Sequence, residues 1–190
     1  MCPNHIIMLN KIVALLLFFI LLPIFVILAI IILLEDGFPV FFTQKRVGIN
    51  NSFFKIYKFR SMKKNTPNVA THLLNNPDQY LLKIGKFIRK TSLDELPNLI
   101  NIIKGEMVFV GPRPALYNQD DLMEFRVATG VSKLKPGITG WAQINGRDEI
   151  SIAEKVKLEQ EYLYRKSFLF DMEIIIKTFT NVLFSKGVSH

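Results

Sequence analysis

The adjacent carboxylates Asp94 and Glu95 are the residues of this 190-residue chain best suited to chemistry. They follow Ser92 and precede an apolar run with three- and four-residue spacing, which predicts that they lie in the first turn of an amphipathic helix. Backbone N–H groups without intrahelical partners collect in such a turn, and the helix dipole is positive there. We therefore expect a carboxylate in this turn to stay ionised and a phosphate to find hydrogen-bond donors.

The same residues also fit a purely structural role. Ser92-Leu93-Asp94-Glu95 matches a capping box, with Ser92 as the N-cap and Glu95 bonding back to it. Pro97 favours a later start of the helix. With Ser92 as the N-cap, Pro97 would be the fifth helical residue and would remove a backbone hydrogen bond, whereas with Asp94 as the N-cap it lies harmlessly in the first turn. The spacing alone leaves the reactive and the helix-starting roles both open.

Two cations on a predicted strand could bind an anion beside this pair. Lys58 and Arg60 alternate with aromatic residues in the run 53–62, which predicts a strand carrying both cations on one face. Two cations on one face suit a phosphate. A solvated strand face, or cations that extend towards a membrane surface, would give the same pattern.

Two further arginines could reach the same ligand. Arg89 ends a basic, amphipathic helical pattern over residues 80–90, five residues before Asp94. Arg113 stands between Pro112 and Pro114 directly after a predicted buried strand at 107–110, so both neighbours restrict the backbone. This is either an ordinary tight turn or a turn that holds a cation in place for an anion.

Composition limits the kinds of partner. The chain has 24 Lys and Arg against 16 Asp and Glu, and its net charge of +8 favours phosphates, anionic lipid or nucleic acid. Cys2 is the single cysteine, which excludes an intrachain disulfide and favours a reducing compartment. The three histidines are scattered without partners at ligand spacing, so no zinc site is predicted.

An uncharged apolar segment at residues 12–34 must position the rest relative to a membrane. As a straight helix it would be about 35 Å long, enough to cross a bilayer core. A single-pass anchor is the default, and a signal peptide is disfavoured because no small-residue cleavage site follows. Pro23, in the middle, also permits a helical hairpin that enters and leaves one leaflet. We therefore divide the chain into a membrane-inserted segment, 1–36, and a second domain, 37–190.

The remaining elements surround the candidate site. Residues 133–147 are punctuated by glycine and predict an extended loop or bulged strand that can approach a ligand closely. Residues 122–129 predict a helix, 149–166 a charged helix, and 168–184 a more apolar helix that would pack on the core or lie on a membrane.

These motifs together resemble a family. Five stretches carry the resemblance: the apolar segment interrupted by proline, KIYKFRSM, RKTSLDELPNLINIIKGEMVFVGPRP, KPGITGWAQINGR and the closing helices. With them, the chain resembles the bacterial sugar transferases of the monotopic polyprenyl-phosphate phosphoglycosyl transferase family, in its small single-domain form. The resemblance covers essentially the whole chain, and the motifs occur in the order of the family.

The resemblance implies a two-step transfer from a UDP-sugar to polyprenyl (undecaprenyl) phosphate, the first membrane step of bacterial glycan assembly. In the family, the aspartate of the dyad attacks the β-phosphate, releases UMP and forms a covalent aspartyl phosphosugar, which the lipid phosphate then displaces. Carried over, Asp94 is the nucleophile and Glu95 its catalytic partner. The resemblance favours an N-acetylated hexosamine, including deoxy-amino forms, as the sugar.

It also implies the ligands of the site. Mg²⁺ is the expected cofactor, held between the diphosphate and Asp94. The cations expected to bind phosphate or nucleotide are Lys58, Arg60, Arg89, Arg113 and Arg147. Pro112 and Pro114 are expected to fix the backbone on either side of Arg113. Nearby cations would reduce the repulsion between an attacking carboxylate and a diphosphate.

The implied architecture is a compact α/β (α+β) domain with amphipathic surface helices and an N-terminal re-entrant helix broken at Pro23. It would lie on the cytoplasmic face of the bacterial inner membrane, with both termini on that face. No nucleic-acid partner is expected, and a homo-oligomer is left open.

Two alternatives from other classes remain. A membrane-anchored basic module that binds lipid or nucleic acid would explain the charge and the apolar segment but would give Asp94 and Glu95 no role. A catalytically inactive assembly scaffold is disfavoured by the intact dyad and arginines.

Overall fold

The computed structural model describes residues 4–67, 76–146 and 150–183. A long apolar helix, α1 (Asn4–Asp36), is followed by a hairpin of β1 (Phe41–Val47) and β2 (Phe53–Phe59) with the 3-10 turn η1 (Ile49–Asn51) between them. Then come η3 (Pro77–Tyr80), α2 (Gly85–Lys90), η4 (Leu93–Glu95), α3 (Asn98–Lys104), β3 (Val108–Val110) and β4 (Ala115–Leu116). The last elements are α4 (Asp120–Ala128), η5 (Val131–Lys133), β5 (Gly137–Thr139), α5 (Trp141–Ile144), α6 (Ile152–Arg165) and α7 (Phe168–Leu183).

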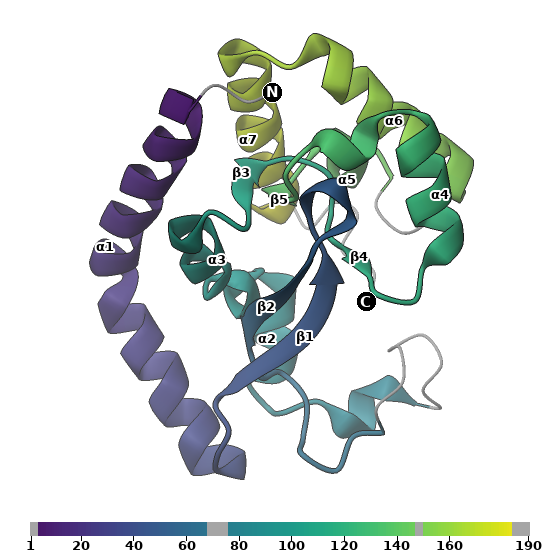
Figure 1. Ribbon diagram of the computed structural model, residues 1–190. Coiled ribbons are helices and arrows are strands. Elements are labelled where there is room, and N and C mark those ends of the chain that lie inside the picture. Colours follow the sequence, from purple (N-terminus) through teal and green to yellow (C-terminus); the bar gives the residue numbers. More distant parts are fainter. Residues whose placement is uncertain (1–3, 68–75, 147–149, 184–190) are drawn as a thin grey trace.

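The strands form two small sheets. β1 lies between β2 and β4 in an antiparallel sheet, and β3 pairs with β5 in a parallel one. Figure 1 shows the β1–β2 hairpin at the centre, with α1 along one side and α4, α5 and α6 grouped on the other. The chain is therefore a mixed helix and sheet domain with a long apolar helix, compatible with the expected membrane-associated α/β architecture.

Helix α1 both packs on this domain and exposes apolar surface. It contains Pro23, continues through it as one helix and bends midway (Figure 1). Its buried residues lie on one helical face: Phe25, Leu28 and Ile32 are spaced by three and four positions, and Ala14 is about three turns earlier. They share a core cluster with Phe59, Ile88 and Ile102 of the domain. Many large apolar side chains on the rest of α1 stay exposed, and the helix is long and apolar enough to cross a membrane.

Both ends of α1 are tied to the domain. Near its start, the Asn10 Oδ1 accepts a 3.0 Å hydrogen bond from the Phe109 backbone N–H. At its end, the Arg60 Nη2 donates to the Asp36 carbonyl at 3.1 Å and lies 3.3 Å from the Asp36 carboxylate. The helix therefore runs alongside the domain and does not project from it.

Several predicted boundaries were wrong. The helix predicted over residues 80–90 is only α2, because Leu81 pairs instead with Met62 in an isolated bridge. The stretch 133–147 is not one extended loop: η5, β5 and the short helix α5 interrupt it. The helices predicted at 122–129 and 168–184 are confirmed within two residues as α4 and α7, and α6 lies within the predicted 149–166.

Candidate functional site

Asp94 and Glu95 do not lie in the first turn of a helix. They form the separate 3-10 turn η4, and α3 begins only at Asn98, with Pro97 as its N-cap. The predicted capping box is also wrong, because Ser92 makes no side-chain cap and has a left-handed backbone (φ 57°). Pro97 separates the two turns because it cannot donate an N–H to a continuous helix. The two carboxylates therefore do not lie at the N-terminus of α3, and cationic side chains together with a backbone hydrogen bond favour the ionised form of Asp94.

Cations from two distant segments converge on Glu95. The Lys58 Nζ, from β2, lies 2.6 Å from the Glu95 Oε1, and the Arg113 Nη1 lies 3.7 Å from the same oxygen. The side chains of Lys58 and Glu95 are 16% and 20% exposed, so water screens their interaction only in part. Three residues that the sequence singled out thus meet at one point.

Asp94, beside this cluster, has a perturbed carboxyl. Burial is the largest effect and raises its pKa from 3.8 to about 6. Lys58 and Arg89 lower the pKa electrostatically, while the neighbouring Glu95 raises it. A carboxyl that titrates near neutrality in a partly buried turn is typical of a functional group. It is still mostly ionised at pH 7, as a nucleophile requires.

Arg60 does not join this cluster. Its guanidinium is buried and contacts the end of α1, through the Asp36 carboxylate and the carbonyls of Asp36 and Gly37 at 3.1 and 2.7 Å. The strand β2 ends at Phe59, so the alternation that predicted Lys58 and Arg60 on one face does not extend to Arg60. Arg60 holds α1 on the domain, whereas Lys58 belongs to the carboxylate cluster.

The other predicted residues fall in different places. Arg89 is in the last turn of α2 and interacts electrostatically with Asp94. Pro112 and Pro114 flank Arg113 between β3 and β4, as predicted. Arg147 lies outside the described residues.

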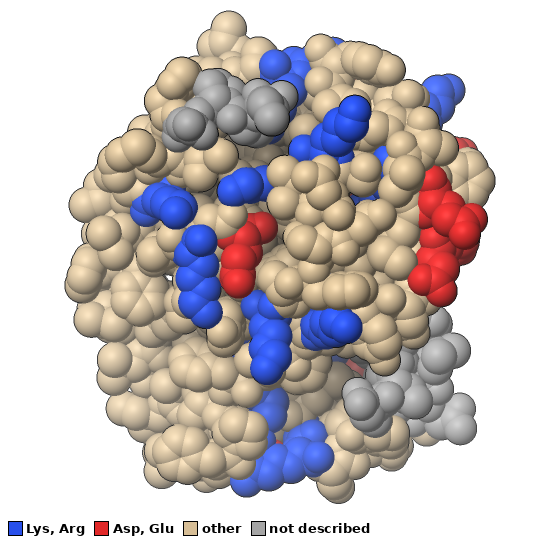
Figure 2. Space-filling model, in the orientation of Figure 1, with Lys and Arg blue, Asp and Glu red and all other residues tan. Residues whose placement is uncertain are grey.

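Basic side chains are spread over one whole face of the molecule. In Figure 2, Lys and Arg are spread over the face seen in Figure 1, while most of the acidic surface there lies in a small group near the middle and another over α4. This distribution agrees with the net charge of +8 and with an anionic ligand.

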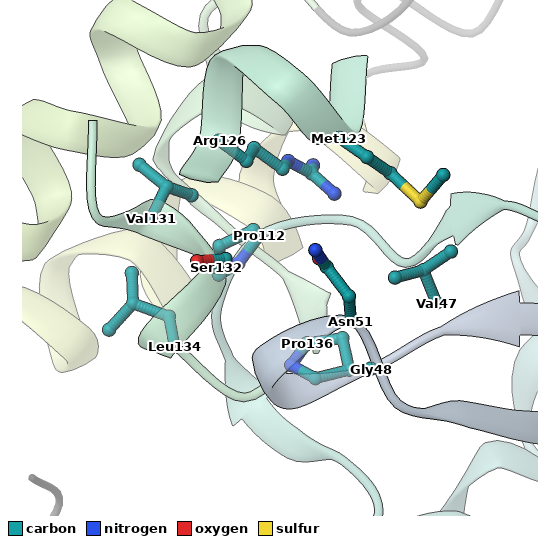
Figure 3. A pocket seen from close by; sticks show the side chains of 10 residues that line it. All are labelled: Val47, Gly48, Asn51, Pro112, Met123, Arg126, Val131, Ser132, Leu134 and Pro136. Carbon is teal, nitrogen blue, oxygen red and sulfur yellow. The ribbon is translucent and has the colours of Figure 1, made fainter. Parts of the chain in front are cut away.

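A small, partly open cavity of ≈ 20 Å³, room for only a water or two, adjoins the turn that carries Arg113. Figure 3 shows Asn51, Pro112, Met123 and Arg126 around it. Neither Asp94 nor Glu95 lines this cavity, so we locate the candidate site by its carboxylates and cations.

The residues present can contribute to a magnesium site but cannot form one alone. In the described part of the chain, no three His, Cys, Asp or Glu side chains gather as metal ligands. Mg²⁺ usually binds one or two carboxylates, several waters and the phosphates of a substrate. Lys58 and Arg113 contact Glu95, so Asp94 is the carboxylate better placed to complete such a set.

A family model described as bacterial sugar transferase matches residues 6–185, nearly the whole chain. The chain belongs to the bacterial sugar transferase family. It is 44% identical over 156 residues to the uncharacterized sugar transferase EpsL of Bacillus subtilis (strain 168), an alignment that covers 82% of this chain and 75% of EpsL. All the site residues named above lie inside the matched segment of the family model.

Other relatives of this bacterial sugar transferase have named substrates. It is 43% identical over 148 residues to the UDP-glucose:undecaprenyl-phosphate glucose-1-phosphate transferase of Escherichia coli (strain K12), covering 74% of this chain. It is 36% identical over 161 residues to the UDP-N-acetylgalactosamine-undecaprenyl-phosphate N-acetylgalactosaminephosphotransferase of Aeromonas hydrophila, covering 82% of this chain. The alignments span only 32% and 38% of those two longer proteins.

Sequence reasoning missed two arginines of this bacterial sugar transferase that support the turn around Arg113. The Arg46 Nη1 donates to the Pro114 carbonyl at 3.1 Å, and the Arg126 Nη2 donates to the Arg113 carbonyl at 3.0 Å. Arg126 lies four residues after the buried Leu122 on the inner face of α4, which was a usable signal for a buried cation. Its ion-pair partner, Glu159, is 33 residues away and gave no local signal.

Proposed function

We propose that this protein transfers a sugar 1-phosphate from a UDP-sugar to a polyprenyl phosphate at a membrane and releases UMP. The observation that carries the proposal is the cluster at η4, where a carboxyl with a raised pKa adjoins a second carboxylate that two cations contact. Membership of the bacterial sugar transferase family supports the reaction class. The names of two relatives, which specify undecaprenyl phosphate and a UDP-sugar, support the two substrates.

In the first step, a carboxylate oxygen of Asp94 attacks the β-phosphorus of the UDP-sugar. A P–O bond to Asp94 forms, the bridging P–O bond breaks, and UMP leaves with that oxygen. In the second step, an oxygen of the polyprenyl phosphate attacks the same phosphorus, and the bond to Asp94 breaks. The products are the polyprenyl diphospho-sugar and the free carboxylate, so atoms and charge balance over the cycle.

The surrounding charges have distinct roles in this proposal. Lys58 and Arg89 stabilise the ionised form of Asp94, since both lower its pKa. Lys58 and Arg113 hold Glu95, which we propose positions or deprotonates the lipid phosphate. Arg89, Arg113 and Arg147 are the proposed ligands of the substrate phosphates, because guanidinium groups bind phosphate oxygens in a bidentate way.

Asp94 is also the residue that we propose would hold Mg²⁺, together with the diphosphate of the substrate. Bound there, the ion would reduce the negative charge that develops on the phosphate oxygens.

The contacts of α1 support a re-entrant arrangement with both ends on the cytoplasmic side. Asn10 and Asp36 are bonded to Phe109 and Arg60 of the same domain. Because the domain packs along α1 and contacts both of its ends, a helix that crossed the bilayer would draw that domain into the lipid. The exposed apolar residues of α1 would face lipid. Labelling of cysteines placed at residues 6 and 38 tests this: opposite sides for the two labels would rule out the arrangement.

The reaction is tested by UMP release from purified protein in nanodiscs with Mg²⁺ and undecaprenyl phosphate. The UDP-sugar panel contains N-acetylated hexosamines, which we propose as substrates, and glucose and galactose. We expect multiple-turnover release that depends on lipid and Mg²⁺, at most one equivalent of UMP per protein without lipid, and no release in Asp94→Asn. Without lipid, we expect the wild type to gain the mass of one phosphosugar on Asp94.

Other outcomes favour the alternatives. No release with any sugar would favour a catalytically inactive scaffold. Salt-sensitive binding to nucleic acid that is equally strong in Asp94→Asn would favour a basic binding module. Release that is undiminished in Asp94→Asn would exclude Asp94 as the nucleophile.

A further inference from the structure

The turn that carries Arg113 has all three of its carbonyls bonded from outside. The Pro112 carbonyl accepts from the Gly137 N–H at 2.9 Å, and the Arg113 carbonyl accepts from the Arg126 Nη2 at 3.0 Å. The Pro114 carbonyl accepts from the Arg46 Nη1 at 3.1 Å. Pro112 and Pro114 have no N–H to donate, so these carbonyl bonds and the proline rings hold the turn.

The central contact comes from a buried ion pair. The Arg126 Nε and Nη2 donate to the two carboxylate oxygens of Glu159 at 2.8 and 2.5 Å. The two side chains are only 9% and 2% exposed. This two-point geometry fixes the plane of the guanidinium, and the same Nη2 then points at the Arg113 carbonyl.

Burial of such a pair is costly and often adds little stability compared with apolar residues of the same size. We therefore look for the conformation that the buried Arg126–Glu159 pair fixes. The contact at the Arg113 carbonyl identifies what is fixed, because the Arg113 side chain extends from that turn to within 3.7 Å of Glu95.

We propose that the Arg126–Glu159 pair is a positioning device, which holds the Pro112–Pro114 turn so that Arg113 stays directed at Glu95. Arg126 contacts the backbone of the turn and lines the cavity behind it (Figure 3). It thus acts on the reaction through Arg113, without touching the reacting groups. The catalytic part of this proposal rests on the proposed function; the positioning part does not.

The test variant is Arg126→Met with Glu159→Leu. Replacement of both residues avoids a stranded buried charge, which would unfold the protein for a different reason. The matched control is Ser151→Ala. It removes the capping box with Glu154 at the start of α6, the helix that carries Glu159, but leaves the ion pair intact.

The first readout is amide hydrogen exchange in residues 108–118, which needs no activity. We expect exchange there to rise about tenfold or more in the double variant and to stay near the wild-type rate in Ser151→Ala. Unchanged exchange in the double variant, or an equal rise in both proteins, would overturn the proposal.

The second readout is kcat/KM for UMP release. We expect losses of about 10- to 100-fold in the double variant and in Arg113→Ala, since a small misplacement of a positioned group has effects of this size. With all three substitutions together, the loss should stay within about threefold of Arg113→Ala alone, because the pair acts through Arg113. Losses that multiply would overturn the proposal. If the wild type released no UMP, the proposed function would fail, while hydrogen exchange would still decide the role of the pair.

Discussion

Lys58 is bonded to Glu95 at 2.6 Å, although its charge also acts on Asp94. Lys58 thus forms an ion pair with Glu95 and acts on Asp94 only through its electrostatic field. Burial then dominates at Asp94 and raises its pKa to about 6. This division leaves one carboxylate fixed in an ion pair and the other with a proton affinity close to physiological pH.

The first prediction concerns the pH dependence of the reaction. The kcat/KM for UMP release should fall about tenfold per pH unit below an apparent pKa near 6, because protonated Asp94 cannot attack phosphorus. Lys58→Met should move this limb to higher pH, since Lys58 lowers the pKa of Asp94. A limb at the ordinary carboxyl value of 3.8 would contradict the perturbed environment.

The second prediction concerns stability. Well below pH 3.8 the Asp94 carboxyl is neutral in the folded and the unfolded chain and has no effect. Between pH 3.8 and about 6 the unfolded chain loses this proton first, so the free energy of unfolding falls as pH rises. Asp94→Asn removes this cost and should stabilise the protein by about 1–2 kcal/mol at pH 7.5. Thermal unfolding in detergent measures the difference, which should vanish at pH 3.5.

The third prediction separates two cations that are only two residues apart. Lys58→Met should lower kcat/KM about 100-fold, because it leaves the carboxylate cluster without its closest cation. Arg60→Met should lower the free energy of unfolding by about 1–3 kcal/mol, because the carbonyls of Asp36 and Gly37 lose their donor. The kcat/KM per folded molecule should then change less than about threefold. The test measures kcat/KM and the thermal unfolding curve on the same preparations of both variants. Equal losses of kcat/KM in the two variants would contradict the separate roles.

The fourth prediction uses the glycine at the start of the Arg113 turn. A Cβ on Gly111 would lie 2.4 Å from the Lys135 carbonyl oxygen, a backbone atom that cannot move freely. Gly111→Ala should therefore displace the turn. It should lower the midpoint temperature of unfolding, and it should lower kcat/KM by more than about tenfold. The control is Gly130→Asn, because a Cβ on Gly130 would meet only the Leu163 Cδ2, at an ordinary contact distance of 3.8 Å, and asparagine tolerates the positive φ of 77°.

The sequence was informative where the signal is local. The uncharged apolar stretch of α1, the alternation in β2 and the prolines around Arg113 each predicted an element or turn that the structure contains. It was less informative where chain segments meet. Pro97 divides a continuous helical pattern into η4 and α3, because its missing N–H outweighs the apolar spacing around it.

The contacts of the arginines depended on distant partners. Arg60 was expected beside Lys58, but the carbonyls at the end of α1 compete for its guanidinium. The pairing of Arg126 with Glu159 follows from the packing of α4 on α6, which no period within either helix reveals. Residue types at the candidate site were thus predictable, whereas their partners required the three-dimensional arrangement.

The packing of α1 has a practical consequence for protein production. Ala14, Phe25 and Ile32 belong to the same core cluster as Ile88 and Ile102, so the inner face of this helix is part of the interior of the domain. Truncation before residue 37 would not yield a water-soluble enzyme, since removal of α1 would expose the core residues that its inner face covers. Detergents or nanodiscs suited to an intact chain are the better route to crystals and assays, and a fusion partner could not replace the helix.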